Sequence, residues 1–226
     1  EESVHNHLLI PRDSYVKSKT EYFLDFLEHE SKKNTEGLEK VRKILLKSLE
    51  ELPEEERGFY EKECAFASQR MQDVFTDNNF KAFEDNPKLV ESETWQDLLE
   101  FSDNTLHWVY ELGRKQYRKG FLEDALAIFR FLSMINPMIP DHWTGTGFVQ
   151  SDMGEDEAAL QSLAMAIVAD PENPFPRYRS AEIYIKLGQD EDALAELEVL
   201  SEIFEKEDSH SLKDAAKKLF DKLQNK

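Results

Sequence analysis

The sequence predicts an all-α protein whose second half is a stack of similar helical pairs. Apolar residues recur at the spacing of amphipathic helices, and no segment alternates apolar and polar residues as a half-buried strand does. The second half also repeats itself every 34 residues, a period that accommodates two helices and their turns. With 226 residues, 40% of them hydrophobic, the chain is long enough to bury a core in one elongated domain or two small ones.

Charge and cysteine content exclude several classes of function. The chain carries 28 Lys+Arg against 47 Asp+Glu, a formal net charge of −19, and neither half is basic. Nucleic acid and anionic lipid repel such a surface, so we expect no nucleic-acid and no membrane partner. No apolar run is long enough to span a bilayer, and no secretory signal is visible at the start. Cys64 is the only cysteine, which fits a cytoplasmic protein without a disulfide, metal or cofactor.

The N-terminal region is predicted to be helical without sharing the repeat. Residues 1–90 form this helical extension, and residues 91–226 form the repeat domain, with the boundary at about residues 85–92. Two stripes of helical spacing lie at residues 22–27 and 38–52. Such stripes need a partner surface, so we expect the extension to pack on the repeats, to bind a further protein or to self-associate.

Two helix starts can be placed in this part of the chain. Pro53 is expected at the first helical position of a helix, because three glutamates, Glu54, Glu55 and Glu56, follow it near the positive end of the helix dipole. Thr94 is expected to cap a second helix, since Asp97 stands three residues later as in a capping box.

Three consecutive repeats cover residues 106–139, 140–173 and 174–207. Their fifteenth positions are all glycine and their twentieth positions all alanine, with no gap in the register: Gly120, Gly154 and Gly188, and Ala125, Ala159 and Ala193. Glycine at position fifteen suits a turn with positive φ after the first helix, helix A. Proline at position thirty-two, Pro137 and Pro171 in the first two repeats, is expected to stop the second helix, helix B.

Position eight indicates how the two helices of a repeat meet. It holds Gly113, Gly147 and Ala181, small residues that let helix A approach the alanine at position twenty of helix B. This pattern resembles the tetratricopeptide repeat family, which implies a curved superhelix. An amphipathic helix at residues 211–224 would then cap the open apolar face of the last repeat.

The resemblance implies a concave groove lined by helix A of each repeat. The lining is aromatic at its centre, and rings can bury the apolar side chains of an extended peptide. Arg114 and Arg118 are candidate anchors for an acidic group. The candidate binding residues are His107, Tyr110, Arg114, Tyr117, Arg118, Thr144, Phe148, Ser151, Phe175, Tyr178, Glu182 and Ile185.

A narrower resemblance lies at the repeat junctions. The segments LHWVYEL (106–112), IFRFL (128–132), PDHWTGTG (140–147) and DPENPFPRY (170–178) resemble the class II chaperones of bacterial type III secretion systems. The resemblance implies a cytoplasmic, non-enzymatic escort that keeps a secreted translocator, effector or gatekeeper soluble by binding an extended segment of it. It also implies homodimerisation through the N-terminal region in many members.

Other functions have less support in the sequence. A generic tetratricopeptide adaptor, which scaffolds partners that are already soluble, is the alternative interpretation. An enzyme has no supporting constellation, because no phosphate-binding loop, nucleophile motif or paired metal ligands occur. His5 and His7 are interpreted as part of a terminal tail rather than as a metal site.

Overall fold

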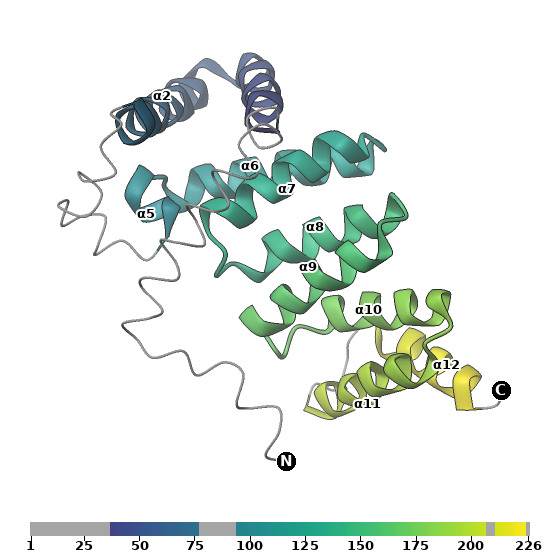
Figure 1. Ribbon diagram of the computed structural model, residues 1–226. Coiled ribbons are helices and arrows are strands. Elements are labelled where there is room, and N and C mark those ends of the chain that lie inside the picture. The colour runs from purple at the N-terminus through teal and green to yellow at the C-terminus, as the bar shows by residue number, and fades with distance from the viewer. Residues whose placement is uncertain (1–36, 77–93, 207–210, 225–226) are drawn as a thin grey trace, which may run out of the picture.

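The computed structural model describes residues 37–76, 94–206 and 211–224, and these residues are helical apart from short turns (Figure 1). Residues 37–50 form the first described helix. The elements that follow are α2 (Glu54–Thr76), α5 (Trp95–Leu99), α6 (Asp103–Arg118), α7 (Leu122–Ile135), α8 (Pro140–Asp152), α9 (Asp156–Ala169), α10 (Pro174–Leu187), α11 (Asp190–Lys206) and α12 (Lys213–Gln224). The predicted all-α class is confirmed, and no strand occurs in the described ranges.

The three predicted repeats are the three helical pairs α6/α7, α8/α9 and α10/α11, stacked in order along the molecule (Figure 1). Helix A of the first repeat begins earlier than expected, at Asp103, because Ser102 caps it by accepting a hydrogen bond from the Thr105 amide. The turns follow the sequence closely. Gly120, Gly154 and Gly188 have φ of 79°, 82° and 73°, the left-handed region where a side chain would be strained.

Helices α7 and α9 stop where proline predicts. Asn136 and Asp170, which precede Pro137 and Pro171, are extended with φ near −140°, as steric conflict with the proline ring requires. The third repeat has Glu205 at the equivalent position, and α11 continues to Lys206.

Small residues permit the close contact between paired helices. A Cβ on Gly147 of α8 would lie 2.7 Å from Leu163 Cγ and 3.2 Å from the Ala159 carbonyl oxygen of α9. Ala159 and Leu163 are fully buried, so the space is already filled. Position eight therefore sets the distance between the two helices of the second repeat.

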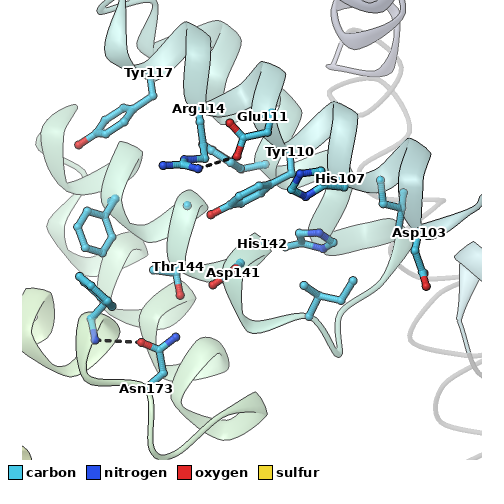
Figure 2. Close-up of a pocket in the computed structure, with 16 residues that line it drawn as sticks. Asp103, His107, Tyr110, Glu111, Arg114, Tyr117, Asp141, His142, Thr144 and Asn173 are labelled. Atoms are coloured by element: carbon cyan, nitrogen blue, oxygen red, sulfur yellow. Dashed lines mark hydrogen bonds and ion pairs between the residues drawn. The ribbon is translucent and has the colours of Figure 1, made fainter. Parts of the chain in front are cut away.

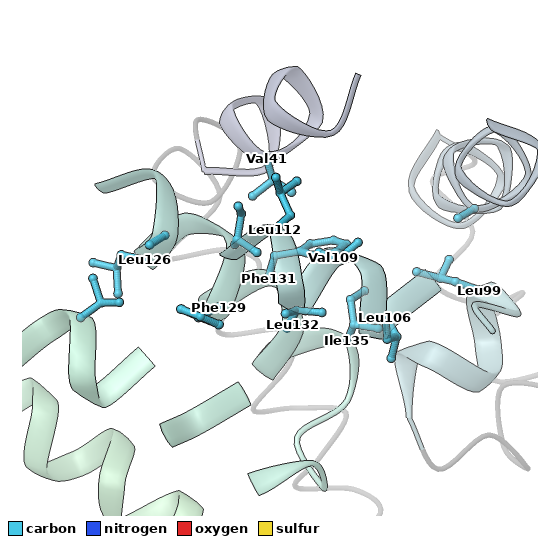
Figure 3. Close-up of a cluster of buried hydrophobic side chains, with 14 residues drawn as sticks. Val41, Leu99, Leu106, Val109, Leu112, Leu126, Phe129, Phe131, Leu132 and Ile135 are labelled. Atoms are coloured by element: carbon cyan, nitrogen blue, oxygen red, sulfur yellow. The ribbon is translucent and has the colours of Figure 1, made fainter. Parts of the chain in front are cut away.

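Helix 37–50 and α2 pack against the first repeat and close that end of the stack (Figure 1). Val41 belongs to the same buried cluster as Val109, Leu112 and Phe131 (Figure 3). Lys40 pairs with Asp124 at 3.0 Å and with Glu123 at 3.3 Å. The described part of the extension therefore shares a core with the repeat domain.

Glu63 ties α2 to the start of α6. Its Oε2 accepts hydrogen bonds from the Ser102 amide at 3.2 Å, from the Ser102 hydroxyl at 2.9 Å and from the Thr105 hydroxyl. A carboxylate at this point also faces the positive end of the α6 dipole. The contact holds the beginning of the helix that carries five of the twelve candidate binding residues.

The predicted helix starts are partly corrected. Helix α2 begins at Glu54, and Pro53 precedes it. The Pro53 carbonyl accepts hydrogen bonds from the amides of Glu56 and Arg57. The prediction that Pro53 is the first helical residue was therefore wrong by one position. The capping box of Thr94 and Asp97 at the start of α5 is confirmed. The stripe at residues 22–27, the boundary at 85–92, and His5 and His7 lie outside the described residues.

The C-terminal end is closed by α12, which begins at Lys213, two residues later than expected. Its Ala216 and Leu223 are buried in one cluster with Leu197, Leu200 and Phe204 of α11. In the described part of the chain, no helix is both long and apolar enough to cross a membrane.

Gly147→Ala is expected to destabilise the fold by about 1–3 kcal/mol, because its methyl group overpacks the contact between α8 and α9. Gly58→Ala is the matched control: nothing lies within 4 Å of its Cβ position, and it should gain about 0.5–1 kcal/mol from helix propensity. Urea unfolding of both variants measures the difference. Equal stability would contradict the inferred close packing at Gly147.

Candidate peptide-binding groove

A groove of about 700 Å³ runs across helix A of the first two repeats to the start of the third (Figure 2). Its walls come from α6 and α8, and Phe129 of α7 and the α10 start complete it. The lining residues are Asp103, Leu106, His107, Tyr110, Glu111, Arg114, Tyr117, Phe129, Ile139, Asp141, His142, Thr144, Gly145, Phe148, Asn173 and Phe175.

The groove brings together seven of the predicted binding residues: His107, Tyr110, Arg114, Tyr117, Thr144, Phe148 and Phe175. The other five, Arg118, Ser151, Tyr178, Glu182 and Ile185, do not line it. Tyr178 and Ile185 instead pack against the C-terminal core. The reach of the binding surface into the third repeat therefore stays a prediction.

Aromatic rings form the centre of the groove. The Tyr110 ring meets the buried Phe129 ring edge-on, with centroids 5.7 Å apart and planes at 61°. Phe129 has room because its neighbour on α8 is glycine: a Cβ on Gly145 would lie 2.7 Å from Phe129 Cδ1. Phe175, 44% exposed, offers an apolar surface at the start of α10. The rings can therefore take apolar side chains of a ligand.

His142 is a groove residue that sequence reasoning missed. Its side chain is buried, and its Nδ1 lies 3.1 Å from the Asn136 carbonyl oxygen, which can only accept, so Nδ1 carries the proton. Burial lowers the pKa of His142, although backbone hydrogen bonds oppose this shift. The repeat pattern places it in the first turn of helix A of the second repeat, but only the fold shows that its ring lies beneath Tyr110, with the ring centroids 6.2 Å apart.

Arg114 is already paired. Its Nη1 lies 2.6 Å from Oε1 of Glu111, one turn earlier on α6, and its guanidinium lies 5.9 Å from the Tyr110 ring centre. The hydrogen bond to Glu111 raises the pKa of Arg114. A ligand carboxylate would have to compete with Glu111 for this guanidinium, which weakens the case for Arg114 as an acidic-group anchor.

A polar bridge connects helix A of all three repeats beside the groove. The Tyr117 hydroxyl of α6 donates to Asp152 of α8 at 2.5 Å, and Asp152 also pairs with Arg179 of α10. Arg179 additionally binds Glu182 at 3.1 Å, and its guanidinium lies 5.4 Å from the centre of the Phe148 ring. Burial and the bond to Asp152 raise the pKa of Tyr117 to about 12. The bridge holds the three helices at a defined separation.

Comparison with known proteins agrees with this architecture. The tetratricopeptide repeat family matches residues 152–223. The Low calcium response locus protein H of Yersinia pestis is 28% identical over 92 residues, which are 41% of this chain and 55% of that protein. The chain therefore spans about half the length of the curated relatives it matches.

Two solved structures extend the likeness. The type III secretion translocator chaperone SycD of Yersinia enterocolitica is 25% identical with a TM-score of 0.53, covering 55% of this chain and 96% of SycD. PcrH of Pseudomonas aeruginosa, solved with the chaperone-binding region of PopD, is 26% identical with a TM-score of 0.53, covering 55% and 95%. The chain therefore has a tetratricopeptide-like helical fold and is similar to the translocator chaperones of type III secretion. The resemblance stated from the repeat junctions is thereby confirmed.

The buried imidazole predicts a pH dependence of stability. Because the pKa of folded His142 lies below its ordinary value of 6.5, the unfolded chain binds the proton first as pH falls. Wild type should therefore lose stability below about pH 6.5, by at most about 1.4 kcal/mol per pH unit from this group. His142→Gln, whose amide can still donate to Asn136, should lose less between pH 7.5 and 5.5 in urea unfolding.

The control for this measurement is His107→Gln, which removes an exposed imidazole from the same groove. It should show the same loss of stability between pH 7.5 and 5.5 as wild type, because the buried His142 ring is retained. If the free energy of unfolding changed with pH equally in His142→Gln and in wild type, the result would contradict a buried, neutral His142 ring.

The polar bridge predicts a change in tyrosine titration. Asp152→Asn removes the charge that disfavours the Tyr117 phenolate, so the pKa of Tyr117 should fall from about 12 toward the ordinary 10. Difference absorbance at alkaline pH, with Tyr117→Phe identifying the signal, measures this shift. An unchanged titration in Asp152→Asn would exclude the bond between the two side chains.

Proposed function

We propose that this protein is a cytoplasmic chaperone of a bacterial type III secretion system. It binds an extended segment of a secreted partner, the client, in the aromatic groove and keeps the client soluble until export. The observation that carries this proposal is the ring-lined groove across helix A of adjacent repeats, in a fold shared with PcrH, which was solved with the chaperone-binding region of PopD.

The geometry suits stoichiometric binding of a peptide. Tyr110, Phe148 and Phe175 expose apolar surface to the groove, while Tyr110 and Thr144 supply hydroxyl groups that can bond to a peptide backbone. At about 700 Å³ the space accommodates a few side chains of an extended segment. The proposed role involves no chemical turnover.

Capture from the source bacterium tests the proposal. Tagged full-length protein and the Tyr110→Ala/Phe148→Ala variant are used as paired baits, and bound proteins are identified by mass spectrometry. A secreted protein that is retained by wild type and lost by the variant is then expressed with and without this chain. A client that is insoluble alone and soluble in the complex supports a chaperone. Partners that are soluble alone would instead indicate an adaptor.

Tyr110→Ala is expected to weaken binding of the client segment by about 1–3 kcal/mol, because it removes a ring that packs on Phe129 inside the groove. Phe121→Ala removes an exposed ring outside the groove and should bind normally. Tyr178→Ala measures whether binding extends over the third repeat. Isothermal titration with a client peptide gives the affinities, and equal values for Tyr110→Ala and wild type would place the site elsewhere.

We also propose self-association through the N-terminal region. Helix 37–50 and α2 carry three exposed apolar side chains: Leu46, Phe59 and Phe66 are 49%, 45% and 44% exposed. SycD, with the same fold, has been solved as a dimer.

Replacing Phe59 with glutamate should shift the full chain toward monomer in sedimentation experiments, because a charge would enter an apolar contact. Val168→Glu provides a matched control, as Val168 is 72% exposed on α9. A sedimentation coefficient that both variants share with wild type would contradict this interface.

A further inference from the structure

We propose that the client segment carries a lysine or arginine beside its apolar anchors, and that Asp141 receives this basic side chain. The inference rests on the proposed function, since it specifies the chemistry of the segment that the groove binds. Asp103 extends the same acidic edge of the groove.

The charge balance of the groove is the first argument. Its lining holds three carboxylates, Asp103, Glu111 and Asp141, against one guanidinium, Arg114. Glu111 and Arg114 neutralise each other at 2.6 Å. The charge left for a ligand to meet is therefore negative, on Asp103 and Asp141.

Asp141 is the more available of these two carboxylates. It is exposed in the first turn of α8, and no described residue forms a hydrogen bond or ion pair with it. Asp103 accepts a hydrogen bond from Gln96 Nε2 at 2.7 Å, which occupies one of its oxygens. Figure 2 shows Asp141 next to Thr144, on the side of the groove toward which the Tyr110 hydroxyl points. Burial is the largest cause of the raised pKa of Tyr110, and the negative charge of Asp141 is the second. This effect agrees with a position of Asp141 close to the Tyr110 hydroxyl.

Neighbouring cations do not cancel this acidic edge. Arg179 forms ion pairs with both Asp152 and Glu182, so its charge is already neutralised within the polar bridge. Asp103 and Arg118 stand at opposite ends of α6. At the rise of an α-helix, their Cα atoms are about 22 Å apart along the helix axis. The charge of Asp141 contributes to the raised pKa of Arg114, so this guanidinium lies within electrostatic reach, but its hydrogen bond is to Glu111 and not to Asp141.

These charges favour a basic client over an acidic one. A ligand ammonium or guanidinium next to Asp141 would gain a partly desolvated ion pair, whereas a ligand carboxylate there would be repelled. The formal charge of −19 acts in the same direction at longer range, because it attracts basic segments during encounter. Apolar anchors then provide most of the affinity, and the ion pair provides selectivity and register.

Selection from phage-displayed random linear peptides tests the inference without knowledge of the client. Full-length wild type is the target, and peptides that lose binding to Tyr110→Ala are retained as groove ligands. We expect lysine and arginine to be enriched among them relative to the unselected library. A synthetic peptide from this set should bind Asp141→Asn about three- to tenfold more weakly than wild type at low salt. The difference should shrink as salt is raised.

Asp192→Asn is the matched control, because Asp192 is also an exposed aspartate in the first turn of a helix, α11, but lies outside the groove. It should bind the same peptide as wild type does. Groove ligands without basic enrichment, or an equal loss in Asp192→Asn, would overturn the inference and leave the groove itself intact. A selection that yields no Tyr110-dependent peptide would contradict both the inference and the proposed function.

Discussion

The stack of repeats and the groove both follow from the close approach of helix A to helix B within each repeat. At Gly147, Leu163 and the backbone of Ala159 occupy the space that a side chain would need. Glycine or alanine at position eight lets the two helices of a repeat pack without water between them. The same geometry, repeated along the chain, produces a stack of helical pairs. The groove exists because helix A of each repeat lies beside the next one, rather than because any single helix is bent to make it.

The same small residues shape the groove from behind. Phe129 belongs to helix B of the first repeat, yet it forms part of the groove because Gly113 and Gly145 leave room for its ring between α6 and α8. Tyr110 then packs against the edge of that ring. An aromatic surface supported by buried neighbours keeps its shape before a ligand arrives, which lowers the entropic cost of binding.

Polar contacts set how the stack is held together at its edges. Glu63 of α2 binds the start of α6, and the Tyr117, Asp152 and Arg179 bridge joins helix A of three repeats. Within the groove, Glu111 and Arg114 pair with each other and Gln96 binds Asp103, whereas Asp141 has no described partner. The net charge that a ligand meets in the groove is therefore that of the side chains left unpaired in the folded protein.

The helical class, the three repeats, their turns and the capping helix could all be predicted from the sequence, because glycine, alanine and proline act through local backbone geometry and recur at one period. The sequence also placed seven of the groove residues, since helix A faces the same side in every repeat. It could not place Phe129, whose ring reaches the groove through the space left by Gly113 and Gly145 on neighbouring helices, or His142, whose ring is buried. Three further features became visible only in the folded chain: Arg114 is paired, Tyr178 packs toward the C-terminal core and helix 37–50 covers the first repeat. The physical reason is that pairing and burial depend on contacts between separate elements, which a periodic pattern along one element does not record.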